Sequence, residues 1–226
     1  MRGSFDTTRP TRVNIGERRK PFPGGRPGYL RVDRVHQGDL DGTKGVYLIN
    51  AVDEVTQCQA VCAVEKSSEA FLLPVLAAMM PAFPFVIHGF HSDNGSEYIN
   101  RQVAALLEKL RIEQTTSRSR QSNDHALAES KHASTRRKHL GYSPIPQHFA
   151  RQVKVFTAQV LSPYLNFHRP CHFPTEYMDK KGRIRKRDRY QEMMTPFEQF
   201  RSLPKAESYL KPETTLKKLE AMAAEC

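Results

Sequence analysis

The sequence predicts an α/β fold in which a mixed five-stranded sheet is flanked by helices. Three strand-like segments come first, and helical and strand-like segments then alternate. Consecutive strands joined by short turns form an antiparallel meander, and the alternation that follows adds strands with helices on the faces of the sheet. With 226 residues, 38% of them hydrophobic, the chain can bury one full core and still have residues left for appendages.

The three expected meander strands follow one another early in the chain. The first begins at Tyr29 (YLRVDRV), the second covers 46–53 (VYLINAVD) and the third covers 57–64 (QCQAVCAV). Short runs rich in valine, isoleucine and other apolar residues, separated by turn residues, are typical of strands. Residues 1–28 hold seven basic residues among glycines and prolines, which predicts a basic, extended N-terminal arm.

Helical and strand-like segments alternate after the meander. Residues 67–80 have apolar residues at helical spacing, with Ser67 as the expected N-cap. The run 84–90 (PFVIHGF) predicts a short buried strand, 97–110 an amphipathic helix and 112–117 (IEQTTS) the fifth strand. The predicted order of elements is therefore βββαβαβ.

Two further helices are expected, over 123–140 and over about 146–162. Large apolar residues lie on one side of the second, namely Phe149, Val153, Phe156 and Val160. Residues 171–226 form a basic C-terminal extension, in which 179–190 (DKKGRIRKRDRY) hold seven basic residues and little that could form a core. Its end, 205–226, predicts a surface helix or a frayed tail.

The charge balance indicates a polyanionic partner. Lys and Arg outnumber Asp and Glu by 35 to 24, for a formal net charge of +11. Charge alone does not separate DNA from RNA or from an anionic membrane. No apolar run is long enough to span a membrane or to act as a signal peptide, so an intracellular protein is expected. The four cysteines show neither disulfide nor zinc-site spacing, which predicts reduced thiols.

Three carboxylates stand where successive elements meet one edge of the predicted sheet. Asp33 lies in the first strand, Asp93 directly follows the fourth, and Glu129 lies in the first two turns of the helix at 123–140. Between Asp93 and Glu129 there are 35 residues. An acid among apolar residues of a central strand, as Asp33 is, lowers stability unless it has a cation or another partner.

Each of these acids also has a plainer interpretation. An aspartate followed by Asn-Gly, as Asp93 is, more often forms a turn than binds a metal. Five further carboxylates compete for a place in the site, and we interpret them as turn, cap or surface residues: Asp39, Asp41, Asp53, Glu97 and Asp124.

Six segments of the chain resemble successive blocks of bacterial insertion-sequence transposases. They are GYLRVDRVHQGD, GVYLINAVDEVTQ, GFHSDNGSEYIN, SRSRQSNDHALAESKH, RRKHLGY and MMTPFEQF, and the resemblance covers about residues 8–203. These transposases belong to the retroviral integrase superfamily of the Asp-Asp-35-Glu type. The resemblance implies an RNase H-like fold, an integrase-type catalytic core over 29–170, and a catalytic triad of Asp33, Asp93 and Glu129.

The activity that this resemblance implies is DNA strand cleavage followed by strand transfer. Family members use Mg²⁺ or Mn²⁺, two ions per active site, and the resemblance makes Asp33 the ligand of both ions, with Asp93 and Glu129 each completing one. Water attacks in the first step and a DNA 3′-hydroxyl in the second. The implied partners are transposon ends, a target duplex and further copies of the chain, with no membrane. The expected location is the bacterial cytoplasm, in association with the nucleoid.

Basic residues near Glu129 and in the C-terminal extension predict a DNA-binding surface. His132, Ala133 and Arg136 share the helix face of Glu129, where a basic side chain could hold phosphates. The complete predicted set is Arg118, Arg120, Lys131, Arg136, Arg137, Lys138, Lys180, Lys181, Arg183, Arg185, Lys186, Arg187 and Arg189. For the basic residues near Glu129, the alternative is a solvated basic helix face. For those at 180–189, the alternative is a solvated basic loop.

Two other functions stay open on the sequence. Nothing before Tyr29 has the helix-turn-helix pattern with which family members recognise element ends. A catalytically silent or truncated DNA-binding remnant of a transposase would keep the basic surfaces, and an RNase H-like nuclease without joining activity would keep the metal site. Cleavage without joining would favour the nuclease. Metal-independent DNA binding with neither reaction would favour the remnant.

Overall fold

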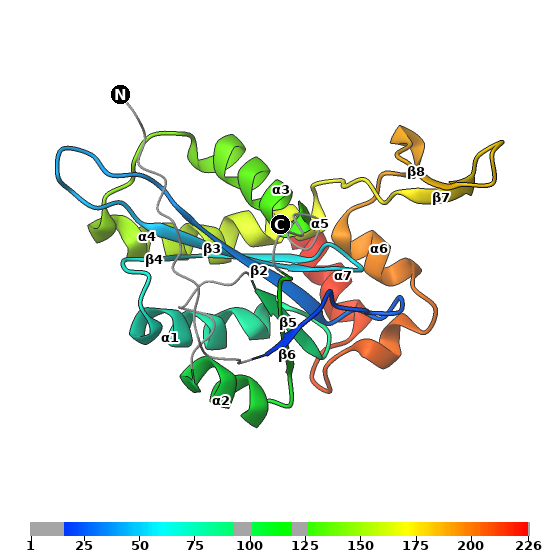
Figure 1. The fold of residues 1–226 in the computed structure, drawn as a ribbon, viewed down its shortest axis with the longest axis horizontal. Coiled ribbons are helices and arrows are strands. Elements are labelled where there is room, and N and C mark those ends of the chain that lie inside the picture. Colours follow the sequence, from blue (N-terminus) through cyan, green and yellow to red (C-terminus); the bar gives the residue numbers. More distant parts are fainter. Residues whose placement is uncertain (1–15, 93–100, 119–125, 226) are drawn as a thin grey trace.

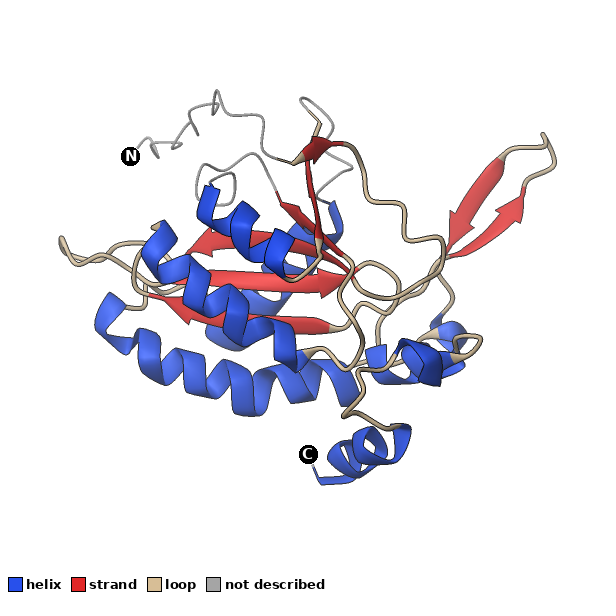
Figure 2. Cartoon of the chain, turned by 90° about the horizontal axis from the view of Figure 1, so that it is seen from below, coloured by secondary structure: helices blue, strands red, loops and turns tan. Residues whose placement is uncertain are grey.

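The chain folds around a mixed sheet with helices on both faces (Figure 1). The computed structural model describes residues 16–92, 101–118 and 126–225. α1 and α2 cover one face of the sheet, and α3, α4 and α5 cover the other. A two-stranded hairpin projects from this body, as Figure 2 also shows.

The main sheet has six strands in the order β1-β6-β5-β2-β3-β4. β2 pairs antiparallel with β3 and β3 with β4, whereas β5, β6 and β1 are added in parallel. This order confirms the predicted mixed α/β sheet, in which a meander precedes parallel strands. The bounds are β1 (Glu17–Arg18), β2 (Tyr29–His36), β3 (Tyr47–Asp53), β4 (Gln59–Val64), β5 (Gly89–Ser92), β6 (Glu113–Thr116), β7 (Thr175–Met178) and β8 (Ile184–Arg187). β1 adds a sixth strand within the predicted N-terminal arm.

The α-helices are mostly shorter than the sequence pattern predicts. They are α1 (Glu69–Met79), α2 (Arg101–Lys109), α3 (Ala126–Thr135), α4 (Ala150–Phe156), α5 (Ser162–Phe167), α6 (Pro196–Ser202) and α7 (Leu216–Glu225). π-Helical turns at Arg136–Leu140 and Thr157–Leu161 continue α3 and α4, and short 3₁₀ turns lie at Met80–Ala82, Gln147–Phe149, Tyr190–Glu192 and Ala206–Tyr209.

Two predicted boundaries are wrong. The N-cap of α1 is Ser68 rather than Ser67. The strand predicted at 84–90 begins only at Gly89, because Phe85 instead forms an isolated antiparallel bridge with Leu210 near the end of the chain. The start predicted for the helix at 97–110 lies outside the described residues.

Most of the side predicted to be apolar on the helix at 146–162 does not face the sheet. Phe149, Phe156 and Val160 are exposed, whereas Val153 is partly buried against the cluster that contains Val46 and Leu48. The fully buried residues are Ala150, Thr157, Leu161 and Leu165. The π-helical turn at Thr157–Leu161 inserts one extra residue per turn, which rotates the buried side relative to a regular 3.6-residue pattern. The buried residues pack on β4, and α5 extends the helix to Phe167.

The main hydrophobic core includes residues from the C-terminal extension. Phe197, Phe200 and Leu219 belong to the same buried cluster as Leu30 and Ile49 of the sheet. A capping box between Thr195 and Glu198 starts α6, which carries two of these phenylalanines. The domain boundary expected at residue 170 stays a prediction, but the core crosses it.

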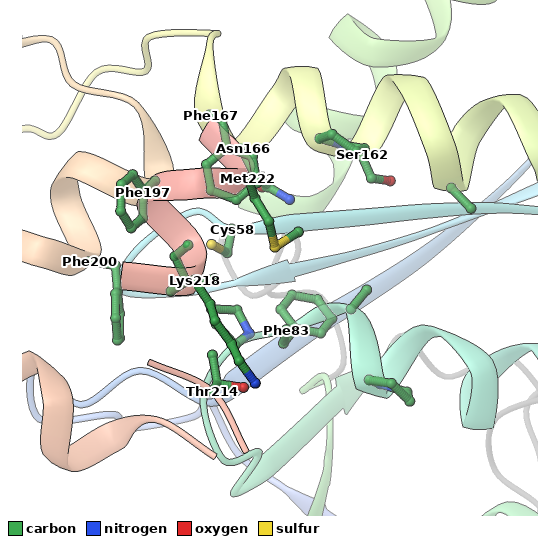
Figure 3. A pocket seen from close by; sticks show the side chains of 16 residues that line it. Cys58, Phe83, Ser162, Asn166, Phe167, Phe197, Phe200, Thr214, Lys218 and Met222 are labelled. Atoms are coloured by element: carbon green, nitrogen blue, oxygen red, sulfur yellow. The ribbon is translucent and has the colours of Figure 1, made fainter. Parts of the chain in front are cut away.

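A cavity of about 320 Å³ lies between α5, α6, α7 and the turn after α1 (Figure 3). Cys58, Phe83 and Met222 line it. Burial raises the pKa of the Cys58 thiol to about 12, and the nearby Asp53 adds to this. Cys58, Cys62 and Cys171 are free thiols, as the sequence predicts for them.

We expect Cys58 to resist alkylation in the folded protein. Raising a thiol pKa from 9.0 to about 12 lowers the thiolate fraction at pH 8 by roughly a thousand-fold, and the thiolate is the reactive species. Mass spectrometry after iodoacetamide treatment should find Cys58 unmodified in the native protein and modified in urea. Rapid native labelling of Cys58 would show that its surroundings are more open than described.

Candidate active site

Asp33 lies at the centre of β2, on the sheet face covered by α3. It pairs across the strands with Asn50 of β3, and its side chain is 17% exposed. Its Oδ2 accepts a hydrogen bond at 2.9 Å from Nδ1 of His132 in α3. The acid in this central strand therefore has a protein partner, so its presence there does not by itself require a cation.

Glu129 lies in the first turn of α3 and is exposed. α3 packs against β2 and β3, so Asp33 and Glu129 belong to facing elements. His132 follows Glu129 by three residues, about one helical turn, and it is this residue that contacts Asp33. Convergence of all three predicted carboxylates stays a prediction.

Asp93 lies outside the described residues. The last described residue before it is Ser92, which pairs in parallel with Val32, the residue before Asp33. Within the described ranges, no group of three or more His, Cys, Asp or Glu side chains is arranged to hold a metal ion.

A buried polar cluster ties α3 to the sheet beneath it. Gln59 Nε2 donates to Oδ1 of Asn50 and to Oγ1 of Thr135, both at 2.9 Å. Thr135 follows His132 by three residues, so two successive turns of α3 contact polar side chains of the sheet. Nδ2 of Asn50 and Nε2 of His132 are buried without a hydrogen-bond partner in the described part of the chain.

A second set of contacts holds α3 from the side of the C-terminal extension. Lys131 Nζ donates to Sγ of Cys171 at 2.8 Å, and Arg169 Nη2 donates to Oγ of Ser134 at 2.7 Å. Cys171 in turn pairs with Met194 just before α6. The helix that carries Glu129 is thus fixed on two sides.

Sequence reasoning placed His132 on the helix face of Glu129 but did not find its contact with Asp33. The ring is 1% exposed and binds Asp33. The signal that could have found this contact is the shared helix face, because a residue one turn after Glu129 on the sheet-facing side must meet β2. No sequence pattern pointed to Asn50 and Gln59 as polar residues of the sheet beneath α3.

The donor set at this site fits a hard divalent cation. Carboxylate oxygens are the ligands that Mg²⁺ and Mn²⁺ prefer. Oδ2 of Asp33 is held by His132, while no hydrogen bond to Oδ1 or to the Glu129 carboxylate is found within the described ranges. Both carboxylates therefore retain oxygens that could bind a metal.

The predicted DNA-binding residues fall into two surfaces. On and after α3, Arg137 and Lys138 are exposed, while Lys131 is half-buried against Cys171 and Nε of Arg136 is buried. Arg118 is exposed, and Arg120 lies outside the described residues. In and after the hairpin the exposed cations are Lys180, Lys181, Arg183, Arg185, Arg187 and Arg189, and the side chain of Lys186 is not described.

Residues 26–122 match the family of integrase core domains. The range of the integrase core match includes Asp33 and Asp93 and ends before Glu129. None of the described helices is long and apolar enough to cross a membrane.

Two further similarities accompany the integrase core match. The uncharacterized protein y4rM of Sinorhizobium fredii is 29% identical over 117 residues, in an alignment that covers 51% of this chain and 33% of that protein. This chain thus spans about a third of that relative. The catalytic core domain of BIV integrase aligns over 63% of this chain and 85% of its own, with a TM-score of 0.47 and 15% identity.

Proposed function

We propose that this chain is the catalytic domain of a transposase that cleaves DNA strands at element ends and joins them to a target duplex. The integrase core match supports a transposase- or integrase-type DNA-processing function. The proposal of cleavage and joining rests on the contact between β2, which carries Asp33, and α3, which carries Glu129. His132 of α3 makes this contact with Asp33. Strand cleavage and joining need acidic ligands close together, and this packing of α3 on β2 supports such a grouping.

The proposed cofactor is Mg²⁺ or Mn²⁺, held by Asp33 and Glu129 together with Asp93. When bound, such ions polarise the phosphodiester and activate the attacking oxygen. The chain itself supplies the carboxylate oxygens and holds α3 against β2, which keeps two of these ligands in fixed relation.

The test is joining of a precut, labelled element end to a target duplex, with a recognition region supplied in trans. Joined product in Mg²⁺ or Mn²⁺ is the expected result. Cleavage without joining would identify a nuclease instead. DNA binding without either reaction, and without metal dependence, would identify a catalytically silent remnant.

We propose the projecting hairpin as a DNA-backbone contact. Among the described strands, β7 and β8 pair only with each other, and Tyr177 of β7 lies opposite Arg185 of β8. The turn between them carries Lys180, Lys181 and Arg183, for which no ion pair with an acidic side chain is found within the described ranges. Exposed cations at the tip of a projecting ribbon suit contacts with phosphates.

Reversing the charges at the hairpin tip should flatten the salt dependence of DNA binding. Each phosphate contact contributes about −0.9 to the slope of log K against log salt on duplex DNA. The combined change Lys180→Glu, Lys181→Glu and Arg183→Glu should therefore reduce the slope by roughly 2 to 3 units. Fluorescence anisotropy of a labelled duplex across a salt series measures it.

The control removes the same charge elsewhere. Lys109→Glu, Lys205→Glu and Lys217→Glu change exposed residues outside the proposed surface. This control should leave most of the slope in place. Equal slopes for the hairpin variant and the wild-type protein would assign the hairpin cations to solvent.

We also propose that the active complex contains more than one copy of the chain. An exposed apolar stripe runs along the outer side of the helix from α4 to α5, with Phe156 37%, Val160 56% and Tyr164 43% exposed. The residue that follows each of them, Thr157, Leu161 or Leu165, is buried, so the three exposed side chains share one outer face. Such a face suits burial against a second copy.

A further inference from the structure

His132 links the two elements that carry the proposed metal ligands. The imidazole is 1% exposed and lies between α3 and β2. Its Nδ1 is 2.9 Å from Oδ2 of Asp33. This contact joins residues 99 positions apart in the sequence.

The direction of this hydrogen bond follows from the acceptor. An ionised carboxylate only accepts, so Nδ1 of His132 carries the hydrogen. Nε2 has no hydrogen-bond partner among the residues that the structure describes. The bond to Asp33 is therefore the one hydrogen bond found for this ring within the described ranges, and it holds one of the two carboxylate oxygens.

We propose that His132 is a positioning residue that orients Asp33 for metal binding. It engages Oδ2 and leaves Oδ1 for the cation, in the way that outer-shell hydrogen bonds orient metal ligands. The same contact joins β2 to α3 one turn after Glu129 in the helix. This inference rests on the proposed metal-dependent function.

The neighbouring contacts show why the single hydrogen bond from His132 can orient the Asp33 carboxylate. The tie from Gln59 to Thr135 fixes the next turn of α3, and Asn50 lies beside Asp33 in the sheet. The helix is thereby docked without His132, and the part left to His132 is the rotation of the Asp33 carboxylate. Loss of its donor should change metal affinity more than it changes folding.

The test compares three substitutions at one position. His132→Asn keeps an N–H donor close to the place of Nδ1, His132→Gln moves the donor to the place of Nε2, and His132→Leu has none. Isothermal titration of the full chain with Mn²⁺ alone measures affinity, and circular dichroism checks the fold. The Gln and Leu variants should bind Mn²⁺ about 10- to 100-fold more weakly than wild type, and the Asn variant within a few-fold.

The pair of Asn and Gln variants keeps the test decisive if the Leu variant does not fold. Equal affinities in wild type and in the Gln variant would overturn the positioning role, and so would equal weakening in the Asn and Gln variants, since the ring would then act by its shape. Asp33→Asn serves as the reference for a lost ligand. A wild-type chain that binds no Mn²⁺ overturns the proposed function as well, whereas binding and joining with no effect at position 132 overturns only this inference.

Discussion

Glu129→Gln is expected to abolish strand transfer while leaving the fold and DNA binding in place. Glutamine keeps the size and helix propensity of glutamate but removes the charge that a hard cation needs. Because loss of an outer-shell partner already weakens a metal site 10- to 100-fold, loss of a ligand should reduce the joining rate by roughly 100-fold or more. Glu129 is exposed, so the free energy of unfolding should hardly change.

The measurement is joining of a precut, labelled end, with DNA affinity measured in parallel. Mn²⁺ should support the wild-type reaction at least as well as Mg²⁺, because it accepts the same ligands with less regular geometry. Ca²⁺ should allow DNA binding without efficient joining, since its ligand distances are longer.

Glu108→Gln makes the same chemical change in α2, at an exposed position outside the site, and should leave joining intact. Equal joining by wild type and Glu129→Gln would remove Glu129 from the ligand set. Asp124 would then be the next carboxylate to test.

Asp53→Ala is expected to cause the largest loss of stability among single substitutions of acidic residues. The Asp53 carboxylate is fully buried at the end of β3. Its Oδ1 accepts from the backbone N–H of Gly28 and Tyr29, and its Oδ2 accepts from the backbone N–H of Val55 and from both the N–H and the hydroxyl of Thr56. It thereby joins the start of β2 to the turn between β3 and β4.

Removing this carboxylate leaves several buried donors unpaired. Each such donor lowers stability by about 1 to 3 kcal/mol, so a total loss of about 3 kcal/mol or more is expected in urea unfolding followed by circular dichroism. Asp53→Asn should be nearly as damaging, because its amide nitrogen would face N–H donors on one side.

Asp41→Asn is the matched control for the aspartate-to-asparagine change. Asp41 is an exposed turn residue with φ of 49°, a conformation that asparagine tolerates, and stability should change by less than about 0.5 kcal/mol. An Asp53→Asn protein as stable as wild type would show that the hydrogen bonds at this site contribute little.

The fold class and the first candidate ligand could be predicted from local sequence patterns. The meander at 29–64 is visible because strand-forming runs and turns are local features, and the structure finds β2, β3 and β4 there. Asp33 stood out because a single acid interrupts an apolar strand. Asp53 did not, since an acid at the end of a strand looks like a turn residue until its five donors are seen.

Which side chains contact one another across the fold could be seen only in the tertiary structure. It brought His132 to Asp33, 99 residues away in sequence, and Leu210 to Phe85. It also turned Leu161 rather than Val160 toward β4, through a π-helical turn that spacing rules do not anticipate. Contacts of this kind depend on how whole elements pack against one another, and a residue's partner across such an interface leaves no pattern in the residues next to it.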